Sequence, residues 1–187
     1  MLAKAGALNG MPEIQHRRDA LWQVELPLHD DLLIPCRSEH RSVLPPMSAG
    51  ERLTADFTTQ GASIGSHPMA LWREAHGSSN VLRSKDLHHL PHGVPITLAG
   101  MVICRQRPST AKGHCFISLE DETGIANLFV PKSTFHRLRR VISGEPFLWI
   151  EGILQRSEGD QPTVYVIHVQ ELDGIEPEHA ARSHDFH

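Results

Sequence analysis

The second half of the chain alternates apolar and polar residues in the way that is typical of β-strands. The alternation runs over residues 96–102, 115–119, 125–130, 147–154 and 163–167. Because successive side chains of a strand point to opposite faces, each segment is expected to bury one face. Between the third and fourth segments, residues 132–142 place apolar side chains at helical spacing after Pro131, which suits the first turn of a helix. The pattern predicts three strands, a helix and two more strands.

This order of elements is the order of the OB-fold, a five-stranded barrel. The first strand of such a barrel has to bend strongly, and Gly100 lies where a bend or bulge is expected. Residues 121–124 predict the turn between the second and third strands. The helix is expected to close the bottom of the barrel, and its outer face is expected to be a solvated surface that carries Arg137, Arg139 and Arg140.

Residues 1–91 predict short helices and loops instead. A helix pair is expected up to about Val24, and Ser48 with Glu51 forms a capping-box pattern at the start of a helix over 48–59. Prolines and charges separate the apolar residues of segment 25–50, which is typical of an extended linker.

Pro68 stands in the first turn of another short helix, and one more turn or helix is expected before Leu90. The predicted fold class is mainly β, a five-stranded OB-fold barrel preceded by a string of short α-helices and linkers. The chain is therefore divided into a helical fragment with a proline-containing linker over 1–91, an OB-fold nucleic-acid-binding domain over 92–172, and an acidic, histidine-containing tail over 173–187.

Composition narrows the setting in which the chain works. No apolar run reaches the ~20 residues that span a bilayer, and no continuous apolar stretch precedes Pro12, so neither a membrane protein nor a secretory signal is expected. Cys36, Cys104 and Cys115 are odd in number and far apart, which favours free thiols in a reducing compartment. A cytoplasmic location is predicted.

Local charge, rather than the net charge of −4, favours nucleic-acid binding. Loop 105–113 carries Arg105, Arg107 and Lys112 among small residues. In OB-folds, the loop between the first two strands flanks the binding face, where cations follow phosphates and aromatic rings stack on bases. Phe116 and Phe129 are the available rings, with the barrel core as the alternative location for each. These five residues are the predicted nucleic-acid-binding site, and in a near-neutral domain we expect weak, salt-sensitive binding.

Other reactive residues predict no metal or cofactor site. His88, His89 and His92 lie around Pro91, which breaks the helix that a zinc-binding histidine pair needs, and no cysteine is near them. They are interpreted as polar loop residues. Cys104 and Cys115, which the first two strands can bring near each other, are interpreted as small core hydrophobes.

Glu120, Asp121 and Glu122 form the acidic cluster of the predicted barrel. They lie at the turn after the second strand, where alternate side chains point apart, so we expect them to be solvated rather than to bind a metal. Nucleotidyl transfer needs paired carboxylates that hold two Mg²⁺ ions, together with a nucleotide pocket. No enzyme activity is therefore expected of the chain by itself.

A family resemblance rests on four stretches: Leu98-Ala99-Gly100-Met101-Val102, Arg105-Gln106-Arg107-Pro108, Thr110-Ala111-Lys112-Gly113 and residues 116–127. Together they resemble the C-terminal OB domain of bacterial error-prone DNA polymerases of the C family, relatives of the polymerase III alpha subunit. Residues 2–9 look like the end of the helix-hairpin-helix region of these enzymes, and residues 65–69 look like the connector. Residues 183–187 look like the ending of the error-prone branch.

The resemblance implies a module that binds single-stranded DNA for an error-prone DNA polymerase in translesion synthesis and DNA repair, with other translesion polymerase subunits as further partners. The palm and the catalytic carboxylates of such an enzyme are absent from this sequence. Two alternatives stay open. The first is a protein-interaction module in a translesion polymerase complex. The second is a truncated gene product without an independent role.

Overall fold

The computed structural model describes residues 1–12, 14–25, 44–77, 80–156, 161–175 and 184–186. Contacts between residues group the chain into two compact units, Met1–Ala62 and Ser63–His187. In the described part of the chain, no helix is both long and apolar enough to cross a membrane. Most of the predicted linker over 25–50 lies outside the described residues.

Unit 1 contains three short helices, α1 (Leu2–Ala5), α2 (Arg17–Glu25) and α3 (Ala49–Gln60). Ser48 accepts a hydrogen bond from the amide of Glu51, and the Glu51 carboxylate accepts one from the amide of Ser48. The predicted capping box is therefore confirmed. The hydrogen bond from the Ser48 amide lowers the pKa of Glu51.

Ion pairs join α2 to α3 within unit 1. The Arg17 guanidinium lies 2.5 Å from the carboxylate of Asp56, and Arg18 lies 2.5 Å from Glu51. The predicted helix pair before Val24 is present, but α1 is only one turn long because Gly6 ends it in the left-handed conformation.

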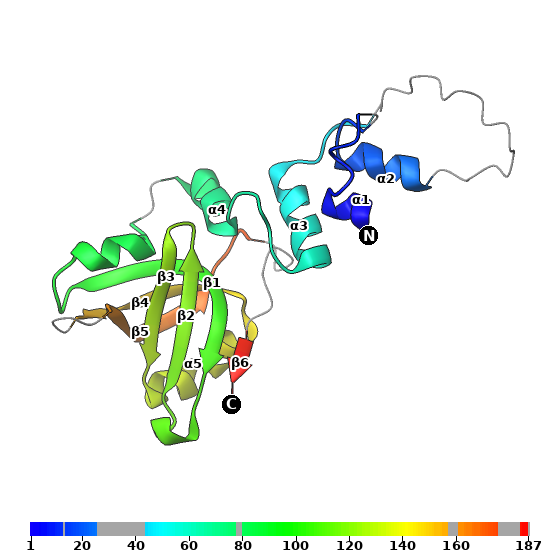
Figure 1. The fold of residues 1–187 in the computed structure, drawn as a ribbon. Helices are drawn as coiled ribbons and strands as arrows, with labels where there is room; N and C mark the ends of the chain where they lie inside the picture. The colour runs from blue at the N-terminus through cyan, green and yellow to red at the C-terminus, as the bar shows by residue number, and fades with distance from the viewer. Residues whose placement is uncertain (13, 26–43, 78–79, 157–160, 176–183, 187) are drawn as a thin grey trace, which may run out of the picture. The chain divides into compact units, whose positions relative to one another are not determined.

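Unit 2 is built around a barrel of five strands, β1 (Pro95–Gln106), β2 (Cys115–Asp121), β3 (Gly124–Val130), β4 (Phe147–Gln155) and β5 (Thr163–Glu171). The strands pair in the order β2-β3-β5-β4-β1, and β1 also pairs with β2, which closes the ring (Figure 1). A short strand, β6 (His184–Phe186), pairs in parallel with the end of β1. The predicted OB-fold is confirmed, although helices hold more residues than strands, so "mainly β" fits the barrel better than the whole chain.

Strand β1 pairs with two neighbouring strands. It pairs with β4 over Pro95–Met101 and with β2 over Met101–Gln106. At Gly100 a Cβ atom would lie 2.6 Å from the carbonyl oxygen of Glu120, so glycine is what allows the two strands this close approach. The register of β1 against β2 shifts between Val102 and Cys104, shortly after this glycine. The strand runs further than predicted, so Arg105 belongs to β1 and not to the following loop.

The barrel interior is filled by aliphatic side chains from every strand, including Leu98, Ile117, Leu128, Ile150 and Val164. Helix α5 (Lys132–Gly144) buries Phe135 and Ile142 against this core, as expected of the helix that closes the barrel. Pro131 is the N-cap residue of α5 and not, as predicted, a residue of its first turn.

Two helical elements precede the barrel within unit 2, α4 (Pro68–His76) and the 3₁₀ helix η1 (Ser84–His89). Arg73 of α4 donates to the carbonyl oxygens of Val81 and Leu82 at 2.8 and 3.0 Å. Its guanidinium also lies 2.9 Å from the carboxylate of Glu122 at the β2–β3 turn. The predicted boundary at residues 91–92 therefore falls inside unit 2.

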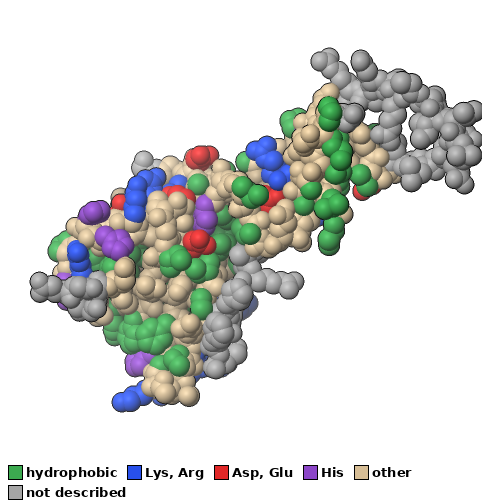
Figure 2. All heavy atoms as spheres, viewed as in Figure 1, with side chains coloured by type: hydrophobic (Ala, Val, Ile, Leu, Met, Phe, Trp, Pro, Cys, Tyr) green, Lys and Arg blue, Asp and Glu red, His purple; other side chains and the backbone are tan. Residues whose placement is uncertain are grey.

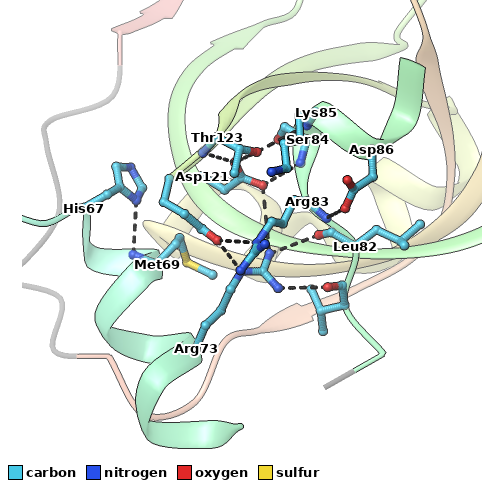
Figure 3. Close-up of polar contacts among 12 residues, drawn as sticks. His67, Met69, Arg73, Leu82, Arg83, Ser84, Lys85, Asp86, Asp121 and Thr123 are labelled. Carbon is cyan, nitrogen blue, oxygen red and sulfur yellow. Dashed lines mark hydrogen bonds and ion pairs between the residues drawn. The ribbon is translucent and has the colours of Figure 1, made fainter. Parts of the chain in front are cut away.

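The expected solvation of the acidic cluster is wrong for two of its three residues. Asp121 is only 4% exposed, and it accepts hydrogen bonds from the amides of Ser84 at 2.6 Å and Thr123 at 2.7 Å (Figure 3). Glu122 pairs with Arg73 and, at 3.0 Å, with Arg83. The pattern of the hairpin alone does not reveal that α4 and η1 cover its turn. Burial is tolerated because both carboxylates are paired.

Candidate nucleic-acid interface

Three aromatic rings form a row across the outer face of β2, β3 and β5. Phe116 lies opposite Phe129, and Phe129 lies opposite Tyr165. The ring centroids are 5.5 and 5.8 Å apart, within the range of favourable aromatic contact. We call Phe116, Phe129 and Tyr165 the aromatic row.

The row points away from the barrel core. On β2 the neighbours of Phe116 are buried while Phe116 itself is 40% exposed, and Phe129 is half-buried between two buried neighbours. The alternative location in the core therefore does not apply to Phe116 or to Phe129. Figure 2 shows a hydrophobic patch on the visible face of the barrel.

Sequence reasoning missed two members of this surface, Tyr165 and His114. Tyr165 reaches the row through the parallel pairing of β3 with β5, which joins segments separated by a helix and a strand. The ring of His114 lies 4.9 Å from that of Phe129. An outward aromatic residue on the fifth strand is a usable signal, but only once the strand register is known.

The loop between β1 and β2 flanks the row, and it contains the short 3₁₀ helix η2 (Ser109–Ala111). Lys112 is exposed and adopts the left-handed conformation with φ of 52°. The guanidinium of Arg107 lies 4.6 Å from the centre of the Phe135 ring, a cation–π contact that holds the side chain against α5. Arg107, Pro108, Ser109 and Gly113 line a hollow of about 330 Å³.

Arg105 has a different environment from the other two predicted cations. Its guanidinium donates to the carbonyl oxygen of Ile142 at 2.7 Å and to that of Glu145 at 2.5 Å, at the end of α5. Cations satisfy the carbonyl groups at helix C-termini in this way. The structure therefore places Arg105 apart from the exposed part of the loop. Arg107 and Lys112 belong to the loop itself.

Lys132 is a further cation near the row that sequence reasoning did not select. It is exposed at the first position of α5, and its amide donates to Nδ1 of His114 at 3.1 Å. A ring nitrogen that accepts a hydrogen bond carries no proton, so the proton of a neutral His114 is on Nε2. The bond fixes the imidazole beside Phe129 with its second nitrogen as the donor.

The arginines on the outer surface of α5 are exposed, as expected of a solvated helix face. Arg137 donates to the carbonyl oxygen of Ile167 on β5 at 2.8 Å. Among the described residues there is no group of three or more His, Cys, Asp or Glu that could hold a metal ion. Cys115 is buried as a small core residue, and Cys104 is half-buried.

A cation-flanked row of rings on the outer face of a five-stranded barrel is the arrangement of an OB-fold nucleic-acid-binding domain. Residues 96–173 match the family described by those words, the OB-fold nucleic acid binding domain. Among solved structures, asparaginyl-tRNA synthetase from Pyrococcus horikoshii is 21% identical, with a TM-score of 0.42 over 57% of this chain and 24% of that chain.

The particular relatives are error-prone DNA polymerases, and the predicted resemblance to them is confirmed. The chain is 43% identical to that of Anaeromyxobacter dehalogenans (strain 2CP-1 / ATCC BAA-258) over 100% of its own length, and 35% identical to that of Pseudomonas fluorescens (strain Pf0-1), also over 100%. It spans 16% and 18% of those polymerases. The chain thus resembles a part of such an enzyme that carries an OB domain.

Proposed function

We propose that the barrel binds single-stranded DNA across the aromatic row, as the C-terminal module of an error-prone DNA polymerase acting in translesion synthesis and repair in the cytoplasm. The observation that carries this proposal is the row itself. Three rings stand side by side on neighbouring strands, and at least one of them is well exposed. Unpaired bases stack on such rings whatever their sequence, because every base has a π-face.

The phosphates of the bound strand follow the cations beside the row. Lys112, Lys132 and the outer part of Arg107 supply this charge, and the Nε2–H of His114 supplies a neutral donor. Arg105 supports the surface by holding the end of α5 in place. Because the domain is near-neutral overall, few phosphates are neutralised, so the affinity is modest and its log–log fall with salt is shallow.

The chain itself performs no nucleotidyl transfer under this proposal. Its role is to hold the template strand. The rest of the enzyme contributes the polymerase body that copies this strand. A purified chain supplied with Mg²⁺ and nucleotides is therefore expected not to extend a primer.

Fluorescence anisotropy with a labelled oligo-dT strand tests the proposal. Phe116→Ala is expected to weaken binding about 5- to 150-fold, the effect of losing ~1–3 kcal/mol of stacking on one base. Ile125→Ala is the matched control, because Ile125 is 54% exposed on the same hairpin but outside the row. Tyr165→Phe keeps the ring and should leave the affinity unchanged, whereas Tyr165→Ala should lower it.

Equal affinities for wild type, Phe116→Ala and Ile125→Ala would contradict stacking on the row. A wild-type chain that binds duplex as tightly as the single strand would contradict the single-strand preference. Absence of any binding at low salt would favour the other function considered, a protein-interaction module within a translesion polymerase complex.

A further inference from the structure

The short strand β6 lies beside the end of β1 and completes its backbone pairing. Strand β4 pairs with β1 over Pro95–Met101, and in the described part of the chain no other barrel strand continues along that edge. Strand β6 pairs with this edge in parallel over Cys104–Gln106, while β2 pairs with the opposite edge (Figure 1). An edge without a neighbour leaves backbone N–H and C=O groups unpaired. The end of β1 therefore depends on β6 for half of its pairing.

This part of β1 leads directly into the loop that carries the exposed cations. Arg107 follows Gln106 in the chain, and Gln106 lies opposite Phe116 of the aromatic row. The pairing of β1 with β2 shifts register between Val102 and Cys104. Irregular pairings of this kind change the local direction of a strand. The direction in which the loop leaves the barrel is therefore set by a short segment beside an irregular pairing.

The other end of the loop is held by contacts with α5. The amide of Lys132 donates to Nδ1 of His114, and a Cβ atom at Gly113 would lie 3.1 Å from the Lys132 side chain. At the β1 end, the side chain of Arg105 donates to carbonyl oxygens at the end of α5. The backbone at the β1 end is instead held by its pairing with β2 and β6.

We propose that β6 positions the loop cations for single-stranded DNA, so that the pairing of β6 with β1 and the binding of DNA strengthen each other. The inference rests on the proposed function, because it concerns how the same surface is held ready for its ligand. With β6 paired, Arg107 and Lys112 follow a strand end that has neighbours on both edges, which reduces the cost of ordering them on binding. With β6 unpaired, that cost is met when DNA binds.

The shortness of β6 makes this coupling measurable. The strand has three residues, so only a few backbone hydrogen bonds hold it, and each makes a modest net contribution to stability. Parallel pairing is also slightly less stable per residue than antiparallel pairing. Because coupling between two binding events is reciprocal, DNA bound at the loop shifts β6 toward its paired state by the same factor that β6 adds to the affinity for DNA.

Asp185→Pro tests the role of the pairing. Asp185 is the middle residue of β6 and lies opposite Arg105, and proline, which has no backbone N–H, disrupts the interior of a paired strand. With labelled oligo-dT in fluorescence anisotropy, the variant should bind about 5- to 25-fold more weakly at ~0.1 M salt. Its log–log salt slope should fall by ~0.7 to ~1.4, which corresponds to one or two lost phosphate contacts.

Asp185→Asn is the matched control, since it removes the same negative charge but keeps the backbone N–H. It should not weaken binding. A loss in Asp185→Asn equal to that in Asp185→Pro would overturn the proposal, because the pairing of the strand would then not be the cause. Thermal unfolding of both variants checks that the barrel is intact.

A double-mutant cycle shows whether β6 acts through the loop. In a chain that carries Arg107→Ala and Lys112→Ala, Asp185→Pro should have no further effect on the affinity for oligo-dT, because the groups that β6 positions are gone. A loss of the same size in both backgrounds would overturn the proposal, since β6 would then stabilise the domain in general.

Hydrogen exchange of the wild-type chain tests the coupling without a substitution. Saturating oligo-dT should slow the exchange of the β6 amides, because a ligand that favours the positioned loop also favours the paired strand. The amides of α2, in unit 1, are the control and should exchange at an unchanged rate. Equal exchange of the β6 amides with and without oligo-dT would contradict the coupling.

The outcomes distinguish this inference from the proposed function. If Asp185→Pro binds oligo-dT as wild type does while Phe116→Ala binds it weakly, the role of β6 is disproved and the aromatic row stands. If Phe116→Ala has no effect, the proposed function itself fails. A loss that is specific to Asp185→Pro and absent without the loop cations, together with slowed exchange of β6, would support the positioning role.

Discussion

The two ends of the β2–β3 hairpin differ in a way that reverses the usual placement of apolar and charged residues. At one end, Phe116 and Phe129 lie on the outer face of the barrel. At the other end, the carboxylates of Asp121 and Glu122 are covered by α4 and η1 and paired with arginines. The hairpin thus has one end built for a ligand and one end built for anchoring the preceding helices.

The comparison shows that exposure depends on what covers a strand as well as on its alternation. Both ends follow the same alternation of inward and outward positions. The outward rings of Phe116 and Phe129, near the β1–β2 loop, stay accessible. The carboxylates at the turn are instead covered by α4 and η1, which supply guanidinium and amide donors. A buried charge is tolerated when it is paired and hydrogen-bonded.

The largest effect is expected at the anchored end. Asp121→Ala removes the acceptor of the Ser84 and Thr123 amides and leaves Arg73 with one carboxylate fewer. Breaking such a buried charged network should lower the free energy of unfolding of unit 2 by about 3 kcal/mol. Denaturant unfolding of the full chain measures this, with the exposed Ile125→Ala as control, expected to change stability by less than ~0.5 kcal/mol. Similar losses in both variants would show that the turn is not an anchor.

An intermediate effect is expected at the ligand end, in the salt dependence of binding. Replacing Lys112 and Lys132 together by Ala removes up to two phosphate contacts, so the log–log salt slope for oligo-dT should fall by roughly 1.4 at ~0.7 per contact. The matched pair, Arg139→Ala with Arg140→Ala on α5, should change the slope little. Equal changes in the two double variants would indicate diffuse electrostatic attraction without a defined path.

The smallest effect concerns His67, which caps α4 by accepting a hydrogen bond from the amide of Met69. Burial lowers the pKa of His67 below its ordinary value of 6.5, although Glu120, Asp121 and Glu122 oppose the shift. The unfolded chain then binds the proton more readily than the folded one, so the free energy of unfolding falls as pH decreases through 6.5.

His67→Asn tests this dependence, because asparagine keeps an N-cap acceptor but does not titrate. The variant should lose less stability than wild type between pH values of about 7.5 and 5.5, which bracket the charge change of histidine. His136→Asn, at an exposed position of α5, is the control and should keep the wild-type profile. A steeper fall in the His67→Asn variant than in wild type would contradict the assignment.

The local sequence alone determined the elements of this protein and their order. Period-two alternation located all five barrel strands, the helical spacing after Pro131 located α5, and Ser48 with Glu51 marked the start of α3. Gly100 could also be singled out, because glycine within a strand marks a special backbone position, and the structure shows there a close approach to the carbonyl oxygen of Glu120. Of the surface, Arg107, Lys112 and two of the rings could be selected from chain position and residue type.

The tertiary structure decided which of those side chains share a surface, since that depends on register and on contacts between distant segments. Tyr165 joined the aromatic row only through the parallel pairing of β3 with β5, and Lys132 came near it only because α5 begins beside His114. Arg105 donates to carbonyl groups at the end of α5 and so lies apart from the surface. Asp121 is paired with Arg73 of α4, a helix some fifty residues earlier in the chain. Local patterns record what one segment needs to bury, whereas the partners of a polar group are set by the packing of whole elements.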